Sequence, residues 1–234
     1  MSQGNIQEKH IRAGRYLKDV IYAANDGIVT TFAVVAATVG GSLSPLTILI
    51  VGIANLFADG FSMASGDYLR SKSEDEFYAK EEAVQRRRIR EQPDKERAEV
   101  RDILAARGYA GADLEEMTRL ATAHEDMWAD FIMHEKLGMA SPGGESPVES
   151  ATFTFGSFVI AGSIPLLPYI VMGTGAPFSI AVAGTAGALF LIGALRSFFS
   201  QSSWIFCGCE MLVIGGSAAV LSYGIGAALA ALVG

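Results

Sequence analysis

Charge is scarce in most of this 234-residue chain. Only 18% of the residues are charged, against about 25% in an average soluble protein, and half are hydrophobic. Residues 70–149 hold 13 of the 18 Lys and Arg and 19 of the 25 Asp and Glu, so the remainder is almost free of charge. This division excludes a uniformly soluble enzyme and a disordered chain, and the net charge of −7 excludes a simple nucleic-acid binder.

Cysteine pairs, signal peptides and catalytic motifs are also missing. Cys207 and Cys209 are too close in sequence for a disulfide of ordinary geometry, and we interpret them as buried thiols rather than as a soft-metal site. The first 18 residues are polar and unlike a signal peptide. There is no Gly-rich phosphate loop, Ser/His/Asp set or Glu-x-x-His pair, so we expect neither an ATP-driven pump nor an enzyme, and no tightly bound cofactor.

Five long apolar segments are typical of membrane-spanning helices, because about 20 apolar residues cross a bilayer. The predicted spans are residues 20–43, 46–69, 151–172, 177–195 and 206–233. The second continues into charged residues 70–90 without a break, so we expect one helix that leaves the membrane. The sequence predicts an all-α, polytopic membrane protein with three parts: residues 1–69 with two spans, 70–149 as a small cytosolic helical domain, and 150–234 with three spans.

The charged segment shows helical patterns of its own. Further helices are predicted at residues 93–107, 114–120 and 124–137. The last of them places Met127, Trp128, Phe131 and Ile132 on one side. Residues 141–147, rich in Ser, Pro and Gly, are expected to form a linker back to the membrane.

Lys and Arg near span ends indicate the cytosolic side of the membrane. They are frequent before residue 19, and Arg196 lies between the last two spans, whereas residues 42–45 and 173–176 have none. We therefore expect the N-terminus and the charged domain in the cytosol and the C-terminus outside. An odd number of spans cannot form the paired inverted repeats of many transporters, so a homodimer would have to supply any two-fold axis.

Two aspartates, Asp26 and Asp59, lie within predicted spans, where a carboxylate costs about 2.5–3.5 kcal/mol and must face protein, water or an ion. Asn55, Asp59, Met63 and Asp67 follow one another at intervals of four and share one helix face. Carboxylates bind any divalent cation and a thioether favours softer metals, so the set predicts Fe²⁺ or Mn²⁺. The alternative interpretation is helix packing, with Met63 as a core residue.

For other polar residues, the sequence gives weaker support for a role in metal binding. Asp19, seven residues before Asp26, is either an entry ligand at the cytosolic mouth or a solvated flank. Asp67 and Glu210 lie near the interface and are interpreted as serving the fold. A second possible metal-binding set with intervals of four is Asp126, Asp130 and His134. We interpret this set instead as the solvated face of a helix.

Several motifs resemble the vacuolar iron transporter family. They are Asp26-Gly27, the run ANLFADGFSMASGDYL at residues 54–69, the run KSE at 72–74, and PLLPY at 165–169. The resemblance covers essentially the whole chain. It implies a homodimeric, five-helix, proton-coupled exporter of Fe²⁺ or similar metals from the cytosol. The brevity of the chain and the form of the motif favour a bacterial inner membrane, with a vacuole-like organelle as the alternative. The resemblance also implies a path between protomers lined by the first two helices, and a three-helix cytosolic domain that gathers metal with Glu and Met.

The resemblance carries over residue by residue, with departures. Asp19, Asp26 and Met63 match the membrane pathway, and Asn55 stands where some members have Glu. The implied transport path is Asp19, Asp26, Asn55, Asp59 and Met63, with metal held by Asp26, Asp59 and Met63. In the cytosolic domain, the positions where metal-binding members carry Glu hold Gln85, Arg88 and Lys136. We therefore expect at most one weaker metal site there, at Glu96, Glu99, Met133 and Glu135.

The hypothesis is export of Fe²⁺, or alternatively Mn²⁺, by proton antiport. A carboxylate must be deprotonated to bind metal, so a proton-rich far side would release the ion and protonate Asp26 or Asp59. The expected partners are a second copy, the lipid bilayer, divalent metal ions and protons, and no nucleic acid. Two alternatives remain: a membrane-anchored metal-binding or sensing protein without flux, and a transporter of this family with altered substrate choice.

Overall fold

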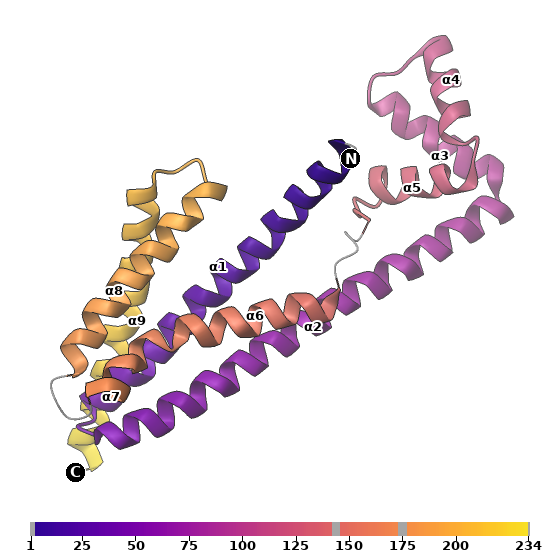
Figure 1. Ribbon diagram of the computed structural model, residues 1–234. Coiled ribbons are helices and arrows are strands. Elements are labelled where there is room, and N and C mark those ends of the chain that lie inside the picture. Colours follow the sequence, from indigo (N-terminus) through magenta and orange to yellow (C-terminus); the bar gives the residue numbers. More distant parts are fainter. Residues whose placement is uncertain (1–2, 142–145, 173–176, 234) are drawn as a thin grey trace. The chain divides into compact units, whose positions relative to one another are not determined.

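The computed structural model describes residues 3–141, 146–172 and 177–233, with side chains from residue 16 onward, and helices dominate these ranges (Figure 1). The chain divides into two compact units. We call residues 1–68 with 146–234 the membrane unit and residues 69–145 the charged unit. The predicted boundaries follow residues 69 and 149, and those of the structure follow residues 68 and 145.

The membrane unit contains helices long and apolar enough to cross a bilayer. Its elements are α1 (Gln3–Gly40), the first part of α2 (Pro45–Glu91), α6 (Pro147–Gly162), η1 (Ile164–Leu166), α7 (Leu167–Met172), α8 (Pro177–Arg196), η2 (Ser197–Phe199) and α9 (Trp204–Val233). Five candidate spans occur in the described residues: Tyr16–Gly40, Pro45–Glu91, Pro147–Met172, Pro177–Phe199 and Trp204–Val233. The prediction of an all-α chain with five spans is confirmed.

Gly and Pro explain where these helices stop. α1 ends at Gly40, Ser42 takes a positive φ of 56° in the turn, and Pro45 begins α2, which runs unbroken to Glu91 as predicted. The third span is not one regular helix. Pro165 and Pro168 lack a backbone N–H, so α6 gives way to the 3₁₀ turn η1 before α7 resumes. The predicted span over residues 151–172 is present, with this 3₁₀ turn inside it.

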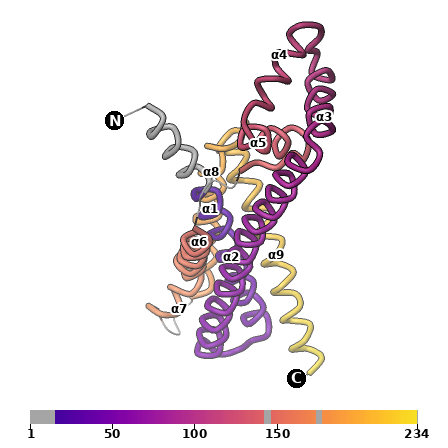
Figure 2. Tube along the Cα trace, turned by 90° about the vertical axis from the view of Figure 1, so that its right-hand side faces the viewer, coloured from indigo at the N-terminus to yellow at the C-terminus, as the bar shows by residue number. Residues whose placement is uncertain are grey.

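α1 is the central helix of the membrane unit. It packs against α6, α8 and α9, and α8 also packs against α9 (Figure 2). The backbones of α1 and α6 approach closely at Gly27 and Gly162, where a Cβ on Gly162 would lie 2.8 Å from the Gly27 oxygen. Such close approach needs small residues, and it brings α6 against the part of α1 that carries Asp26.

The charged unit consists of the end of α2 together with α3 (Pro93–Ala106), α4 (Gly111–Ala121) and α5 (Glu125–Glu135), which fold back on one another (Figure 2). Its core is Ile89, Val100, Leu104, Leu114, Ala121, Trp128, Ala129 and Ile132. The three predicted helices are present with shifted ends. Met127 is 50% exposed, so its predicted place on the apolar face is wrong, and Met133 is buried instead. Residues 142–145 of the predicted linker lie outside the described residues.

The two cysteines differ in environment. Cys207 is buried and Cys209 is exposed, and both are free thiols. The interpretation as buried thiols therefore holds for Cys207 alone.

Candidate metal path

The structure brings Asp26 of α1 close to Asp59 of α2. Both side chains are half-buried within spans, and their carboxylates are near enough for the two charges to interact. Like charges in a membrane repel strongly unless a cation or a proton separates them. The pair is therefore suited to binding a positively charged species.

Asn55 makes a specific contact with this pair. Its Nδ2 donates a hydrogen bond of 2.9 Å to Oδ2 of Asp59, one helical turn along α2. A glutamate at this position would add a third negative charge, whereas the amide holds the Asp59 carboxylate in place and keeps Oδ1 as a further acceptor. Asn55 thus contributes a hydrogen bond to Asp59 where a glutamate would add charge repulsion.

Met63 and Asp19 flank the pair. Met63 is half-buried and packs against the core cluster that includes Leu56 and Phe158, so it has a packing role whatever its role toward a metal. Asp19 is half-buried on α1, about two turns before Asp26. The assignment of these residues to a metal path stays a prediction.

Helix α6 contacts the parts of α1 and α2 that carry the two aspartates. Gly162 of α6 faces the backbone of Gly27, and a Cβ there would also lie 2.5 Å from Cδ1 of Leu56. Gly60, next to Asp59, faces the rings of Phe155 and Phe158 on the same helix α6. α6 is therefore the common support against which both α1 and α2 pack.

Asp67 serves the fold, as expected for a residue near the interface. It accepts a 2.6 Å hydrogen bond from Ser150 Oγ and a 3.1 Å hydrogen bond from Thr154 Oγ1, both buried on α6. These two hydroxyls were missed by the sequence analysis, although their spacing of four at the start of the third span was a usable signal. Glu210 likewise forms an ion pair of 2.8 Å with Arg196.

The charged unit uses its acidic residues in ion pairs. Lys136 forms an ion pair with Glu99, and Arg107 forms one with Glu135. The hydrogen bond from Lys136 holds the pKa of Glu99 below its ordinary value of 4.5. Two of the four residues expected to form one weaker metal site are thus already paired with cations of the chain.

The other two residues of that expected site are buried. Met133 is fully buried, and Glu96 is 2% exposed with its Oε2 lacking a hydrogen-bond partner. Gln85 is also buried with an unpartnered oxygen, while Arg88 is exposed. Buried oxygens without partners fit a cation better than the paired Glu99 and Glu135 do. The weaker site stays a prediction.

The second possible metal-binding set, on α5, does not form a metal cluster. Asp126 accepts a 2.6 Å hydrogen bond from Arg86, which raises the pKa of that guanidinium, and Asp130 and His134 are exposed. Within residues 3–141, 146–172 and 177–233, no group of three or more His, Cys, Asp or Glu side chains comes together to hold a metal. One chain therefore offers Asp26 and Asp59 as a pair, and a fuller coordination shell needs other ligands.

The sequence pattern of the VIT family matches residues 17–227, which include the charged unit and all or most of each span. The chain belongs to the VIT family. This VIT family chain is 32% identical over 217 residues to Vacuolar iron transporter 1 of Arabidopsis thaliana, covering 92% of the chain and 87% of that relative. It is 30% identical to the Vacuolar iron transporter of Toxoplasma gondii, covering 99% of the chain and 80% of that relative.

A third relative, the Vacuolar iron transporter of Centaurea cyanus, is 31% identical over 93% of the chain and 89% of its own length. The resemblance drawn from the motifs is therefore confirmed. As a VIT family member, the chain is a multi-pass membrane protein of a transporter family and not an enzyme.

Proposed function

We propose that this protein transports Fe²⁺, or alternatively Mn²⁺, out of the cytosol in exchange for protons. The observation that carries the proposal is that Asp26 and Asp59 lie inside two membrane spans, within electrostatic range of each other. The relatives named as iron transporters support the choice of iron.

The donor atoms suit a transition metal of intermediate softness. Asp26 and Asp59 offer carboxylate oxygens, Asn55 offers an amide oxygen, and Met63 offers a thioether one turn beyond Asp59. Oxygen donors alone would suit Mg²⁺, Ca²⁺ or Mn²⁺, and the thioether shifts the preference toward softer transition metals such as Fe²⁺. Asp19 would receive the ion at the cytosolic mouth.

A second copy of the chain would complete the path. α2 also carries large apolar side chains that stay exposed, with Ile50 60%, Phe57 51% and Phe61 69% exposed. Polar Asn55 and Asp59 lie half-buried on the same helix, where lipid contact would be costly. A homodimer with α1 and α2 at its interface would enclose these groups and double the number of carboxylates. Light scattering of the detergent-solubilised protein measures its oligomeric state. We expect a dimer, and a monomer would contradict the proposal.

Proton coupling follows from competition at the carboxylates. Asp26 and Asp59 bind a metal ion only when ionised, so protons from an acidic far side displace the ion and reset the site. The Lys and Arg at the N-terminal flank and at Arg196 favour an orientation with the N-terminus and the charged unit in the cytosol. The compartment opposite is the exterior of a bacterial inner membrane, or alternatively the lumen of a vacuole-like organelle.

Fe²⁺ uptake into proteoliposomes tests the proposal. With an acidic interior, we expect uptake by the wild type that disappears without the pH gradient and falls to the level of empty liposomes in Asp26→Ala. Glu149→Gln, which removes an exposed carboxylate from the start of α6, is the matched control and retains uptake. Gradient-independent uptake contradicts the coupling, and full uptake by Asp26→Ala contradicts the site.

The same preparation separates the alternatives. A metal-binding or sensing protein binds Fe²⁺ stoichiometrically without flux. A transporter with altered substrate choice moves Mn²⁺, Co²⁺ or Zn²⁺ faster than Fe²⁺ under identical conditions.

A further inference from the structure

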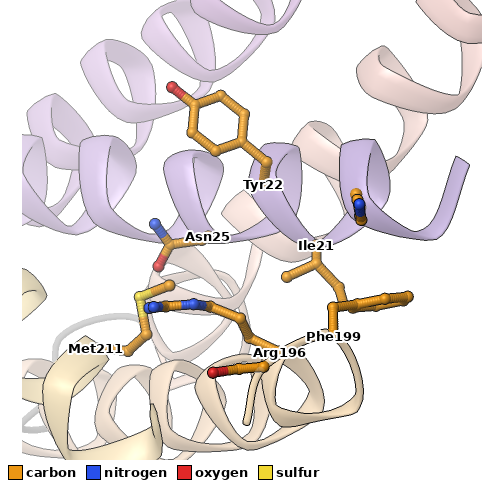
Figure 3. Close-up of a pocket in the computed structure, with 8 residues that line it drawn as sticks. Ile21, Tyr22, Asn25, Arg196, Phe199 and Met211 are labelled. Carbon is orange, nitrogen blue, oxygen red and sulfur yellow. The ribbon is translucent and has the colours of Figure 1, made fainter. Parts of the chain in front are cut away.

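A cavity of about 370 Å³ lies in the membrane unit, outside the path of Asp26 and Asp59 (Figure 3). It is bounded by α1, α8, η2 and α9. The residues that line it are Lys18, Ile21, Tyr22, Asn25, Arg196, Phe199, Ser200 and Met211. It therefore combines cationic, polar and apolar side chains.

Two cations far apart in sequence meet at this cavity. The ammonium of Lys18 lies 5.9 Å from the centre of the Phe199 ring, and the side chain is exposed. Arg196 extends beside Met211 below Asn25 (Figure 3). One of its nitrogens pairs with Glu210, its side chain is 41% exposed, and the guanidinium has further N–H groups. An anion in the cavity would therefore have donors from both α1 and α8.

The two cations of the cavity lie near the ends of their helical spans. Lys18 is close to the beginning of the span Tyr16–Gly40, and Arg196 is the last residue of α8. These two, together with Lys9, Arg12 and Arg15, are the only Lys and Arg of the membrane unit. Lipid phosphates lie at the depth where spans begin and end, and basic pockets between membrane helices bind anionic headgroups.

A separate apolar hollow is also lined by residues of η2. Its volume is about 540 Å³, and it is lined by Leu191, Ala194, Leu195, Ser197, Phe198 and Trp204. Phe198 and Trp204 are 78% and 56% exposed, as is typical of aromatic residues at a membrane interface. The cationic cavity suits the phosphate headgroup of a phospholipid, and the apolar hollow, which shares η2 with it, suits the acyl chains. A free anion would use only the cationic cavity.

We propose that this cavity binds the phosphate of an anionic phospholipid, with Lys18 and Arg196 on the phosphate and the acyl chains on the apolar surface beside η2. Binding would join α1 to α8 and α9 at one end of the membrane unit. Asp26 follows Lys18 by about two turns of α1, so the lipid would steady the helix that carries the metal path. The site itself does not depend on the proposed transport activity.

Lipid titration of the purified full-length protein in a mild detergent tests the site. The probe is short-chain phosphatidylglycerol, with binding counted by native mass spectrometry and affinity taken from the thermal shift. We expect one tightly bound lipid per chain, at least tenfold weaker binding of phosphatidylcholine because its choline is cationic, and no shift with inorganic phosphate at the same concentration.

Variants locate the binding. Lys18→Gln and Arg196→Gln are each expected to weaken phosphatidylglycerol binding about tenfold or more, and Lys18→Gln alone decides if Arg196→Gln fails to fold. Glu210→Gln releases Arg196 and is expected to tighten binding. Lys72→Gln removes an exposed positive charge from the charged unit and leaves the affinity unchanged.

Three results would overturn the proposal. Equal affinity of the wild type and Lys18→Gln excludes this cavity. Equal binding of phosphatidylcholine excludes selection for an anionic lipid, and an equal shift with inorganic phosphate identifies a free-anion site in place of a lipid site.

Discussion

Gly162→Ala tests whether the close packing of α6 against α1 positions the proposed metal path. The new Cβ would lie 2.8 Å from the oxygen and 3.0 Å from the carbonyl carbon of Gly27, so the backbones must separate by about 0.6 Å to reach an ordinary contact of 3.4 Å. Leu56 can rotate away, but the backbone of α1 cannot. Overpacking of this kind costs about 1–3 kcal/mol, which corresponds to a fall in Tm of about 2–12 °C for a chain of this size.

Gly156→Ala is the matched control on the same helix. Nothing lies within 4 Å of its would-be Cβ, and alanine favours a helix by up to about 1 kcal/mol over glycine. The apparent Tm in detergent, taken at one scan rate, should therefore fall for Gly162→Ala and hold or rise for Gly156→Ala. Fe²⁺ uptake should fall only for Gly162→Ala, because Asp26 follows α1. Equal Tm values for the two variants would refute the reasoning.

Two further predictions concern polar contacts. Asp67→Ala leaves the buried hydroxyls of Ser150 and Thr154 without their acceptor, so we expect a loss of about 1–3 kcal/mol of stability, with a smaller loss in Asp67→Asn, which keeps one oxygen. Because Lys136 lowers the pKa of Glu99 in the folded state, the stabilisation from this pair is present above pH 4.5 and is lost as the pH falls through the lowered pKa. For a partly exposed pair, we expect this contribution to be about 0–1 kcal/mol, and we expect it to be absent in Lys136→Met.

Tryptophan fluorescence separates the two units in these measurements. Trp128 is buried in the charged unit and Trp204 begins α9, so each Phe substitution leaves one reporter. In the Trp204→Phe background, Trp128 reports the unfolding of the charged unit. If the loss of its stability at low pH is the same in Lys136→Met, the role of Glu99 is contradicted. Equal stabilities of Asp67→Ala and Asp67→Asn would contradict the role of the carboxylate oxygens.

Much of the architecture was predictable, because it depends on local composition. Apolar length gives the spans, and the absence of a helix breaker after residue 69 gives the long α2. The prolines at 165 and 168 were visible, yet the interrupted third span was not predicted, since prolines in membrane helices are often accommodated without a break. Met127 was misplaced because α5 is short, and a small error in its phase exchanges a buried position for an exposed one.

The sequence by itself determined that carboxylates lie inside the membrane, because a bilayer fixes the length of a span and makes Asp26 and Asp59 stand out. Only the tertiary structure decided which groups the polar residues contact. Asp67 accepts hydrogen bonds from hydroxyls 83 and 87 residues away, and Lys18 lines the same cavity as Arg196, which lies near the other end of the chain. Such pairings depend on how helices pack, and helical periodicity specifies the face of a helix but not its neighbour.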